Sequence, residues 1–387
     1  MRDLAAALAD RHARHLYRQR HIIDGPQGPR LQSYSKTLLS FCSNDYLGLA
    51  SHPLLIKALQ QGAERYGVGS GASHLITGHS RAHHDLEQAL AAFTGQPRVL
   101  LFSNGYMANL GVITALAGRH DIICQDRLNH ASLIDAARLS GAGLERYHHG
   151  DIGALQQLLE KHRQQETLIA SDGVFSMDGD IAPLPALLKL ATQHNSWLVL
   201  DEAHALGIIG KQGRGSREYY SLPDSNPALI TVGTLGKAFG TSGAFVAGSD
   251  DLIETLIQLA RTYIYTTALS PAIAHATLTS LQLVNEEGWR REHLQTLIQR
   301  FREGARHLSL PLMASETPIQ PLLLGSSARV LQLSEQLQEQ GILVSAIRPP
   351  TVPQGQARLR ITLSAAHQPE DIDQLLETLG KLKPALI

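Results

Sequence analysis

Short apolar segments alternate with longer amphipathic segments through much of the chain. "RVLLF" (98–102) precedes "SNGYMANLGVITALAG", "DIICQ" (121–125) precedes "NHASLIDAARLSG", and "TLIASDGVFSMDGD" (167–180) precedes "PLPALLKLATQHN". "WLVL" (197–200) and "ALITV" (228–232) are further apolar runs. Fully apolar short strands that alternate with helices are typical of a mainly parallel sheet covered on both faces. The pattern therefore predicts an α/β protein.

The beginning of the chain has a different pattern. Residues 1 to about 20 place Leu4, Leu8 and Leu16 among alanines and basic residues, which predicts an amphipathic helix. The turn-rich stretch "FCSNDYLGLASHP" follows, and it predicts a connector without regular structure.

The character changes again after about residue 285. Two long charged helices are predicted, and "ARLRITLS" (357–364) alternates apolar and polar residues like a strand with one polar face. We expect three parts: an N-terminal helix and connector (1–46), a large domain (47–285) and a smaller α+β domain (286–387).

Composition narrows the classes of function. The 387 residues carry a net charge of −1, which does not favour a nucleic-acid or anionic-membrane partner. The two cysteines, Cys42 and Cys124, show no CxxC or Cys/His spacing, so neither zinc nor a disulfide framework is expected. The first residues carry too many charges for a signal peptide, and no apolar run reaches the ~20 residues of a membrane span. We expect a cytoplasmic protein.

Polar residues follow several predicted strands, where ligands gather in open α/β sheets. Asp201 ends "WLVL", and His204 comes three residues later. Such a carboxylate can pair with a buried cation, although a helix N-cap is an equally good interpretation. A metal site of the form Asp-x-x-His is weaker, because no second ligand cluster is evident. "SNG" (103–105) opens a helix and suits a phosphate, or it is an ordinary α/β turn.

"TLGKAFG" (234–240) follows "ALITV" and holds Lys237 between glycines. Thr231 and Ala238 do not match a Walker phosphate loop, and the chain lacks a GxGxxG fingerprint in its glycine-rich stretch. What remains is a lysine that acts as a nucleophile or base, or forms a Schiff base, unless it is a plain loop lysine. Thr234 could donate its hydroxyl to an anion.

His130 and Arg348 are two further candidates for a cofactor or substrate site. His130, in "NHASL", is either a structural histidine or a flat ring that stacks on an aromatic cofactor. Arg348, before two prolines, could bind a carboxylate bidentately or form an interdomain salt bridge. A Schiff-base lysine, a carboxylate for a pyridinium, a phosphate site, a stacking ring and a carboxylate clamp are what pyridoxal 5′-phosphate (PLP) requires.

The chain resembles the α-oxoamine synthases, PLP enzymes of the aspartate-aminotransferase-like fold (PLP fold type I). The resemblance runs from "SNDYLGL" (43–49) through "GVFSMDGD" (173–180), "DEAHALGIIGKQGRG" (201–215) and "TLGKAFG" to "ARLRITLSAAH" (357–367). It implies a mainly parallel central sheet in a PLP-binding large domain, with an N-terminal helical segment and a smaller C-terminal α+β domain.

The resemblance also implies roles for the residues around the cofactor. Lys237 would form the Schiff base with PLP and act as acid and base. Asp201 would hold the pyridinium proton, and His204 would hydrogen-bond the phenolic oxygen. His130 would stack on the ring and act as a catalytic residue, and Ser176 would lie beside the cofactor.

Phosphate and substrate contacts follow from the same resemblance. The phosphate would be bound by Gly105, Tyr106, Thr234 and, from the neighbouring subunit of a homodimer, Thr267. Arg348 would bind the amino-acid carboxylate. The other expected substrate contacts are Asn44, Arg18 and Thr351, the last two with the acyl substrate.

Within the family, "AIRPPTVPQGQARLRITLSAAH" (346–367) resembles the members that condense L-alanine with a pimeloyl thioester in biotin synthesis, releasing carbon dioxide and a thiol. The thioester could be carried by coenzyme A or by an acyl carrier protein. One alternative is a member that uses glycine and acetyl-CoA. The other is a non-catalytic homologue, which would be expected to lack the lysine.

Two stretches depart from the family pattern. Asp172 stands where the family commonly has Glu, which draws the carboxylate back by one methylene. "GSGASHLITGHS" (69–80) has His74 near an expected arginine, in a region expected near the mouth of the active site.

Overall fold

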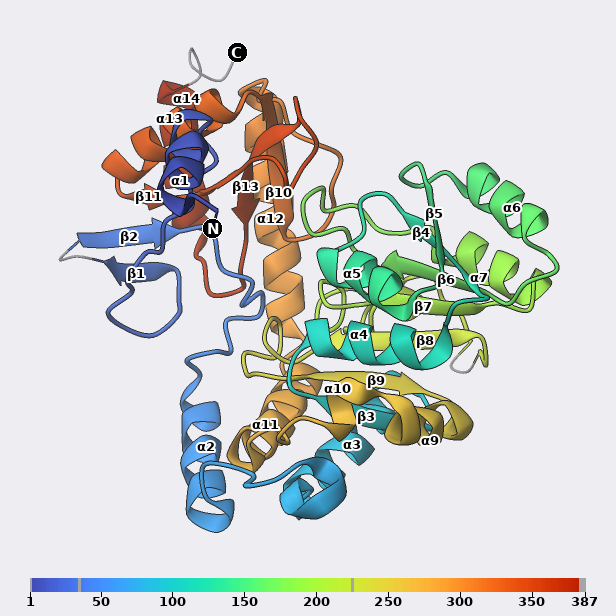
Figure 1. The fold of residues 1–387 in the computed structure, drawn as a ribbon. Helices are drawn as coiled ribbons and strands as arrows, with labels where there is room; N and C mark the ends of the chain where they lie inside the picture. Colours follow the sequence, from blue (N-terminus) through green and yellow to red (C-terminus); the bar gives the residue numbers. More distant parts are fainter. Residues whose placement is uncertain (1, 34–35, 224–225, 383–387) are drawn as a thin grey trace. The chain divides into compact units, whose positions relative to one another are not determined.

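The computed structural model describes residues 2–33, 36–223 and 226–382. The chain forms two compact units (Figure 1). The terminal unit comprises Met1–Gly48, Met177–Asp180 and Arg290–Ile387, and the central unit comprises Leu49–Ser176 and Ile181–Trp289. The N-terminal and C-terminal segments thus share one unit. The division into three domains remains a prediction.

The central unit contains a sheet of seven strands within the described ranges. Their order across the sheet is β3 (Arg98–Phe102), β9 (Ala244–Gly248), β8 (Leu229–Thr234), β7 (Trp197–Asp201), β6 (Thr167–Asp172), β4 (Ile122–Asp126) and β5 (Gly143–Tyr147). All neighbours from β8 to β5 are parallel, and β9 is antiparallel to both β3 and β8. The predicted mainly parallel sheet is confirmed.

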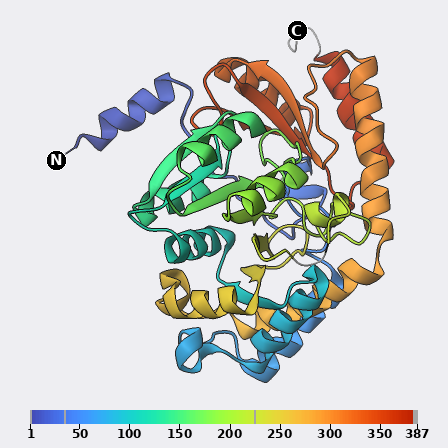
Figure 2. The ribbon, with the colours of Figure 1, turned by 90° about the vertical axis from the view of Figure 1, so that its right-hand side faces the viewer.

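Helices cover both faces of this sheet. One buried cluster joins α4 (Gly105–Leu116), α5 (Ala131–Ser140) and α9 (Asp250–Leu259) to the strands, and the other joins α6 (Ile152–Lys161) and α7 (Leu184–Gln193) to the opposite face. Figure 2 shows this layering from a second direction. The remaining helical segments of the unit are α2 (Pro53–Tyr66), η1 (His74–Gly78), α3 (Arg81–Thr94), α8 (Ser216–Tyr219), α10 (Arg261–Ile264) and α11 (Pro271–Glu286).

The central strands of this sheet are mostly apolar because both of their faces are buried. In β7, Val199 belongs to the first cluster, whereas Leu198 and Leu200 belong to the second. In β6, Ala170 and Ile169 divide in the same way. Successive side chains of a strand point to opposite faces, so each face needs its own apolar residues.

The terminal unit is smaller and mixed. One sheet has the order β1 (Arg30–Ser33), β2 (Lys36–Ser40) and β11 (Ile342–Leu343), and the other has β10 (Ile319–Gly325), β13 (Ala357–Thr362) and β12 (Ser345–Ile347). Its helices are α1 (Leu4–Ala13), α12 (Trp289–His307), α13 (Ser327–Glu339) and α14 (Pro369–Lys381). The α+β character predicted for the C-terminal part is confirmed. No helix in the described ranges has the length and apolarity needed to cross a bilayer.

The predicted N-terminal helix is shorter than expected. Helix α1 ends at Ala13, so Leu16 lies outside it. His15, at φ 55, has left the right-handed helical region and so prevents continuation. The helix buries none of its residues, so Leu4 and Leu8 do not pack as an amphipathic face would.

Strand β13 is confirmed, but its polar side chains are not exposed. Arg358 and Arg360 are both buried. Arg358 pairs with Asp178 at 2.7 Å, and Arg360 donates to Asn44 Oδ1 at 3.2 Å and to Thr362 Oγ1 at 3.0 Å. Buried guanidinium groups require such partners. Alternation of polarity therefore predicted the strand but not the burial of its polar face.

Glu202 directly follows β7 and is a buried carboxyl group. One of its oxygens accepts the main-chain N–H of Ser216 at 2.6 Å. Desolvation raises the pKa of Glu202 to about 7; the charge of Asp201 adds to the rise, and Ser216 and Arg217 oppose it. Burial therefore shifts the equilibrium of Glu202 toward the neutral acid in the folded protein.

We expect Glu202→Gln to change how stability depends on pH. Because the folded pKa lies above the ordinary value, the wild-type stability linked to Glu202 is complete at low pH and is lost as pH rises through about 7. Between about pH 5 and pH 8, the variant should therefore gain up to about 3 kcal/mol in unfolding free energy relative to the wild type. Urea denaturation at both pH values measures this difference. The exposed Glu64→Gln is the control, and an equal response of both variants contradicts the assignment.

Candidate active site

The carboxyl ends of three neighbouring parallel strands meet at one edge of the central sheet. The register pairs Asp172 of β6 with Asp201 of β7, and Asp201 with Val232 of β8. The chain then leaves β8 at Thr234, forms the loop 235–243 and returns as β9. This loop carries Lys237, so parallel pairing brings the predicted carboxylate and lysine to the same edge.

The lysine loop is held by its own backbone. Leu235 N–H donates to Gly243 O at 2.9 Å, and Gly240 N–H donates to Lys237 O at 2.9 Å. Gly240 has φ 65, and a Cβ there would lie 2.5 Å from the main-chain nitrogen of Ala50. Only glycine suits that position.

Lys237 and His204 are in direct contact. Lys237 is half-buried, and its Nζ lies 2.7 Å from Nε2 of His204, which is itself buried. This distance allows a hydrogen bond in which a proton is shared between an amine and an imidazole. The two residues that were assigned to one cofactor are therefore neighbours.

The carboxylate of Asp201 is held by two donors. Oδ1 accepts the N–H of Ala203 at 2.9 Å, and Oδ2 accepts Nδ2 of Asn109 at 2.7 Å. A turn rather than a helix follows Asp201, so the alternative of a helix N-cap is wrong. The carboxylate ends the strand with both oxygens acting as acceptors.

His130 is the N-cap residue of α5 and is anchored through its backbone and Nδ1. Its N–H donates to Asp172 Oδ2 at 2.8 Å, and Nδ1 lies 2.7 Å from Ser132 Oγ. Although His130 is an exposed residue, partial desolvation lowers its pKa; Lys237 adds to this effect, and Asp201 opposes it. Desolvation, followed by the charge of Asp201, raises the pKa of the buried Asp172 well above its usual range.

The expected phosphate-binding residues lie on separate segments of the central unit. Gly105 and Tyr106 form the first turn of α4, where main-chain N–H groups lack intrahelical acceptors. Thr234 donates to Gly243 O at 3.3 Å and accepts the N–H of Gly236 at 3.4 Å. Thr267 is exposed between α10 and α11.

Tyr106 and Ser176 are two further residues that were predicted to lie at the cofactor. The Tyr106 ring lies edge-on to the His130 ring, at 6.5 Å between centroids, and its hydroxyl contacts Asp135. Ser176 is half-buried in a turn that follows β6.

Three of the predicted substrate residues line one cavity of the terminal unit. Arg348, Arg18 and Thr351 border this cavity of about 620 Å³, and Arg18 Nη2 donates to Thr351 Oγ1 at 3.3 Å. Asn44 does not line it; its Oδ1 accepts from Arg360 at 3.2 Å and from the Tyr46 hydroxyl at 3.2 Å.

Arg348 donates to main-chain carbonyls. Its Nη1 contacts His15 O, and its Nη2 lies 3.3 Å from Tyr17 O. Desolvation and the neighbouring charge of Arg18 lower the pKa of Arg348. No carboxylate among the residues that the structure describes forms an ion pair with it, so the alternative of an interdomain salt bridge receives no support.

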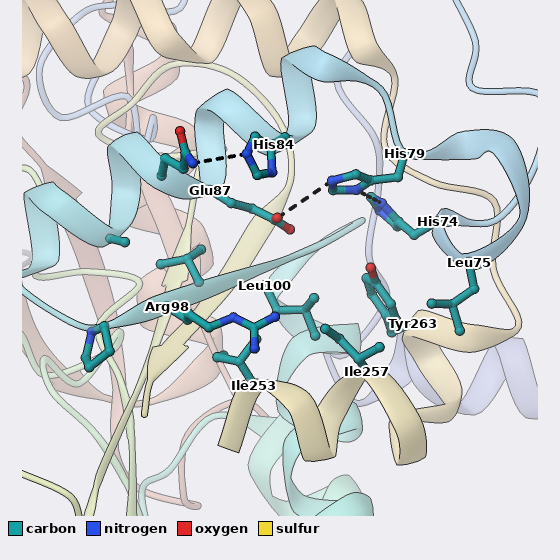
Figure 3. Close-up of a pocket in the computed structure, with 14 residues that line it drawn as sticks. His74, Leu75, His79, His84, Glu87, Arg98, Leu100, Ile253, Ile257 and Tyr263 are labelled. Carbon is teal, nitrogen blue, oxygen red and sulfur yellow. Dashed lines mark hydrogen bonds and ion pairs between the residues drawn. The ribbon is translucent and has the colours of Figure 1, made fainter. Parts of the chain in front are cut away.

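His74, which departs from the family pattern, lines a second cavity of about 490 Å³ in the central unit (Figure 3). His74 Nδ1 lies 3.0 Å from His79 Nδ1, and its ring stacks on Tyr263 with centroids 4.8 Å apart. Burial, with smaller contributions from His83 and His79, lowers the pKa of His74 to about 3. None of the predicted site residues lines this cavity.

Sequence reasoning missed two polar residues on the helices beside the strand ends, Asn109 of α4 and Ser132 of α5. Both are fully buried, and the Asn109 amide bridges Asp201 and Ser132. The available signal was a lone amide in the apolar helix "GYMANLGVITAL". Within the described ranges, no group of three or more His, Cys, Asp or Glu residues is arranged to hold a metal ion.

Comparison with known families identifies the class of protein. The sequence model of the family "Aminotransferase class I and II" matches residues 36–379. The match covers most of the chain, which therefore belongs to this family.

Individual relatives narrow the assignment. The 8-amino-7-oxononanoate synthase of Stutzerimonas stutzeri is 60% identical over 380 residues, which are 98% of this chain and 96% of that protein. The synthase of the same name from Pseudomonas savastanoi pv. phaseolicola is 59% identical and covers 99% of this chain and 96% of its own length. Within the family, the chain therefore belongs with the 8-amino-7-oxononanoate synthases.

Solved structures support the fold. A serine palmitoyltransferase from S. paucimobilis with a bound PLP–myriocin aldimine superposes with a TM-score of 0.93 at 28% identity, over 100% of this chain and 99% of that one. The 8-amino-7-oxononanoate synthase of Francisella tularensis has a TM-score of 0.79 at 36% identity, over 90% and 98%. The expected aspartate-aminotransferase-like fold is confirmed.

Proposed function

We propose that the chain is a PLP-dependent acyltransferase that condenses L-alanine with a pimeloyl thioester to give 8-amino-7-oxononanoate, carbon dioxide and a free thiol in biotin synthesis. The observation that carries the proposal is the group of side chains at the ends of β6, β7 and β8. There, the Lys237 amine contacts His204. Asp201 is held as a hydrogen-bond acceptor at the end of β7, the strand that pairs with β8. The names of the relatives support the choice of substrates.

The residues at this edge fit PLP. Lys237 would hold the cofactor covalently, Asp201 would accept a hydrogen bond from the protonated pyridine nitrogen, and His130 presents an exposed flat ring. Gly105 and Thr234 would contribute donors to the phosphate, one from the backbone at a helix N-terminus and one from a hydroxyl. When bound, PLP stabilises the negative charge that develops at the amino-acid α-carbon.

We assign the proton transfers to Lys237, with His204 and Asp201 in supporting roles. Lys237, as a free amine, takes the α-proton of alanine and later returns a proton to the same carbon. His204, 2.7 Å from Nζ, keeps the amine oriented and stabilises its protonated form by accepting a hydrogen bond. Asp201 accepts hydrogen bonds from two N–H donors, which hold its carboxyl group in place.

The rest of the reaction balances with one proton from solvent, which the leaving thiolate takes up. The alanine α-carbon bonds to the thioester carbonyl carbon, and the thiolate leaves and is protonated. The alanine carboxylate is then lost as carbon dioxide. We assign the initial binding of this carboxylate to Arg348, with Asn44, Arg18 and Thr351 as further substrate contacts. Arg348 now donates to neutral main-chain carbonyls. Its hydrogen bonds would become stronger if a substrate carboxylate replaced these partners.

The proposal predicts a substrate preference. Thiol release should be much faster with L-alanine and pimeloyl-CoA than with glycine and acetyl-CoA, and Lys237→Ala should lower it by at least about 10³-fold because one group serves as both anchor and base. Thiol detection with both substrate pairs measures this. A preference for glycine and acetyl-CoA contradicts the choice of substrate. Equal background release by wild type and variant favours the non-catalytic homologue.

A homodimer with shared active sites is part of the proposal. Thr267 is exposed, and its segment lies beside the glycine-rich segment: Ala268 N–H donates to Ala72 O at 3.0 Å, and Ser270 Oγ donates to Val68 O at 2.7 Å. Val68 is 81% exposed, and Tyr265 is 69% exposed. Exposed apolar side chains on these two segments favour burial by a partner, here a second copy.

Complementation tests whether Thr267 acts across the dimer. Lys237→Ala and Thr267→Ala should each lower activity as homodimers. When the two variants are unfolded together and refolded, a mixed dimer combines Lys237 of one subunit with Thr267 of the other in one intact site. Activity should therefore rise well above the sum of the separate variants. No gain, with mixed dimers verified by mass, contradicts the shared site.

We further propose a cytoplasmic location. Cys42 and Cys124 are both free thiols, which suits a reducing compartment. Burial raises the pKa of each thiol, so neither is readily ionised.

A further inference from the structure

Asn109 lies fully buried in α4, and its side-chain amide joins two groups of the proposed cofactor site. Nδ2 is 2.7 Å from Asp201 Oδ2 and 2.9 Å from Ser132 Oγ. A primary amide carries two hydrogens, so it can donate to both oxygens at once. The amide oxygen makes no hydrogen bond to a described residue. Asn109 therefore contributes two hydrogen-bond donors to the proposed cofactor site.

The hydrogen bonds that follow have a defined direction. The main-chain N–H of Ser132 points at His130 Nδ1 at 3.3 Å, and an N–H group can only donate, so Nδ1 is unprotonated. The Ser132 hydroxyl, 2.7 Å from the same nitrogen, must then donate as well. Its oxygen is left to accept from Asn109. Hydrogen bonds thus run from Asn109 through Ser132 to His130, whose ring proton lies on Nε2.

We propose that Asn109 and Ser132 are positioning residues, which keep Asp201 a hydrogen-bond acceptor and fix His130 as the ring protonated on Nε2. This inference rests on the proposed function. Donors to a carboxylate lower its affinity for protons. With Asn109 in place, a proton between Asp201 and the cofactor therefore stays on the ring nitrogen. A positive ring nitrogen is what makes the cofactor an effective acceptor of negative charge.

Loss of the amide has an expected direction. Without Asn109, Asp201 binds the proton more strongly, and the ring nitrogen loses positive charge. A second positive charge on the same cofactor then becomes easier to form, so the pH midpoint of its absorbance should rise. Ser132→Ala should leave this midpoint closer to the wild-type value, because the contact between Asn109 and Asp201 remains. It should lower kcat through His130 instead.

The experiment compares Asn109→Ala, Asn109→Asp and Ser132→Ala with Val112→Ala, a buried truncation on the same helix outside the chain of hydrogen bonds. PLP is titrated into each apoprotein, its absorbance is followed against pH, and thermal unfolding is recorded. Both Asn109 variants should raise the midpoint by about one pH unit or more. They should weaken PLP binding about 10- to 100-fold, as loss of an outer hydrogen-bond partner does at metal sites. Val112→Ala should lower only the unfolding temperature.

The result that would overturn this inference differs from the result that would overturn the proposed function. If both Asn109 variants keep the wild-type midpoint and PLP affinity and lose only thermal stability, as Val112→Ala does, Asn109 is a packing residue and the inference is overturned. The Asp variant keeps the size of the side chain and replaces the amide by a carboxyl group, so it separates loss of the amide donors from loss of volume. If the wild type itself takes up no PLP, the proposed function fails before any variant is compared.

Discussion

The parallel register of β6, β7 and β8 is the constraint on which the site depends. It places Asp172 beside Asp201, and Asp201 beside Val232, so that three strand ends and the lysine loop share one edge. Each strand can hold this register because both of its faces are covered by apolar clusters. A slip of one residue would exchange the two faces of a strand, so the core that stabilises the sheet also aligns the polar ends.

The same edge concentrates buried carboxyl groups, two of which are costly to ionise in the folded protein. Asp172, Asp201 and Glu202 are all buried, and the pKa values of Asp172 and Glu202 are raised by desolvation and by Asp201. Asp201 differs in having an amide and a main-chain N–H directed at its oxygens. Perturbed groups gathered in this way are typical of functional sites, where stability is given up for chemistry.

The sequence predicted best what depends on local periodicity. The strands of the central unit have apolar runs because both faces are buried, and their order with the helices predicted the parallel sheet. The N-terminal helix was overestimated because alanine and leucine favour a helix whether or not it packs, and α1 buries none of its residues. The burial of Arg358 was out of reach, because its partner Asp178 lies 180 residues away.

Contacts between distant segments also explain what was missed at the site. Asn109 contacts Asp201 across 92 residues of sequence, so nothing next to the asparagine marks it as functional. The contact between Lys237 and His204 was not predicted, although both residues were assigned to one cofactor. The roles of these residues remain predictions.

The central claim is that one lysine anchors the cofactor and then acts as the base. The most direct measurement is reduction of the PLP-loaded wild-type protein with borohydride, followed by digestion and mass mapping of the peptides. The account predicts a pyridoxyl group on Lys237 and on no other lysine. A modified lysine elsewhere, or no modified peptide at all, would contradict it.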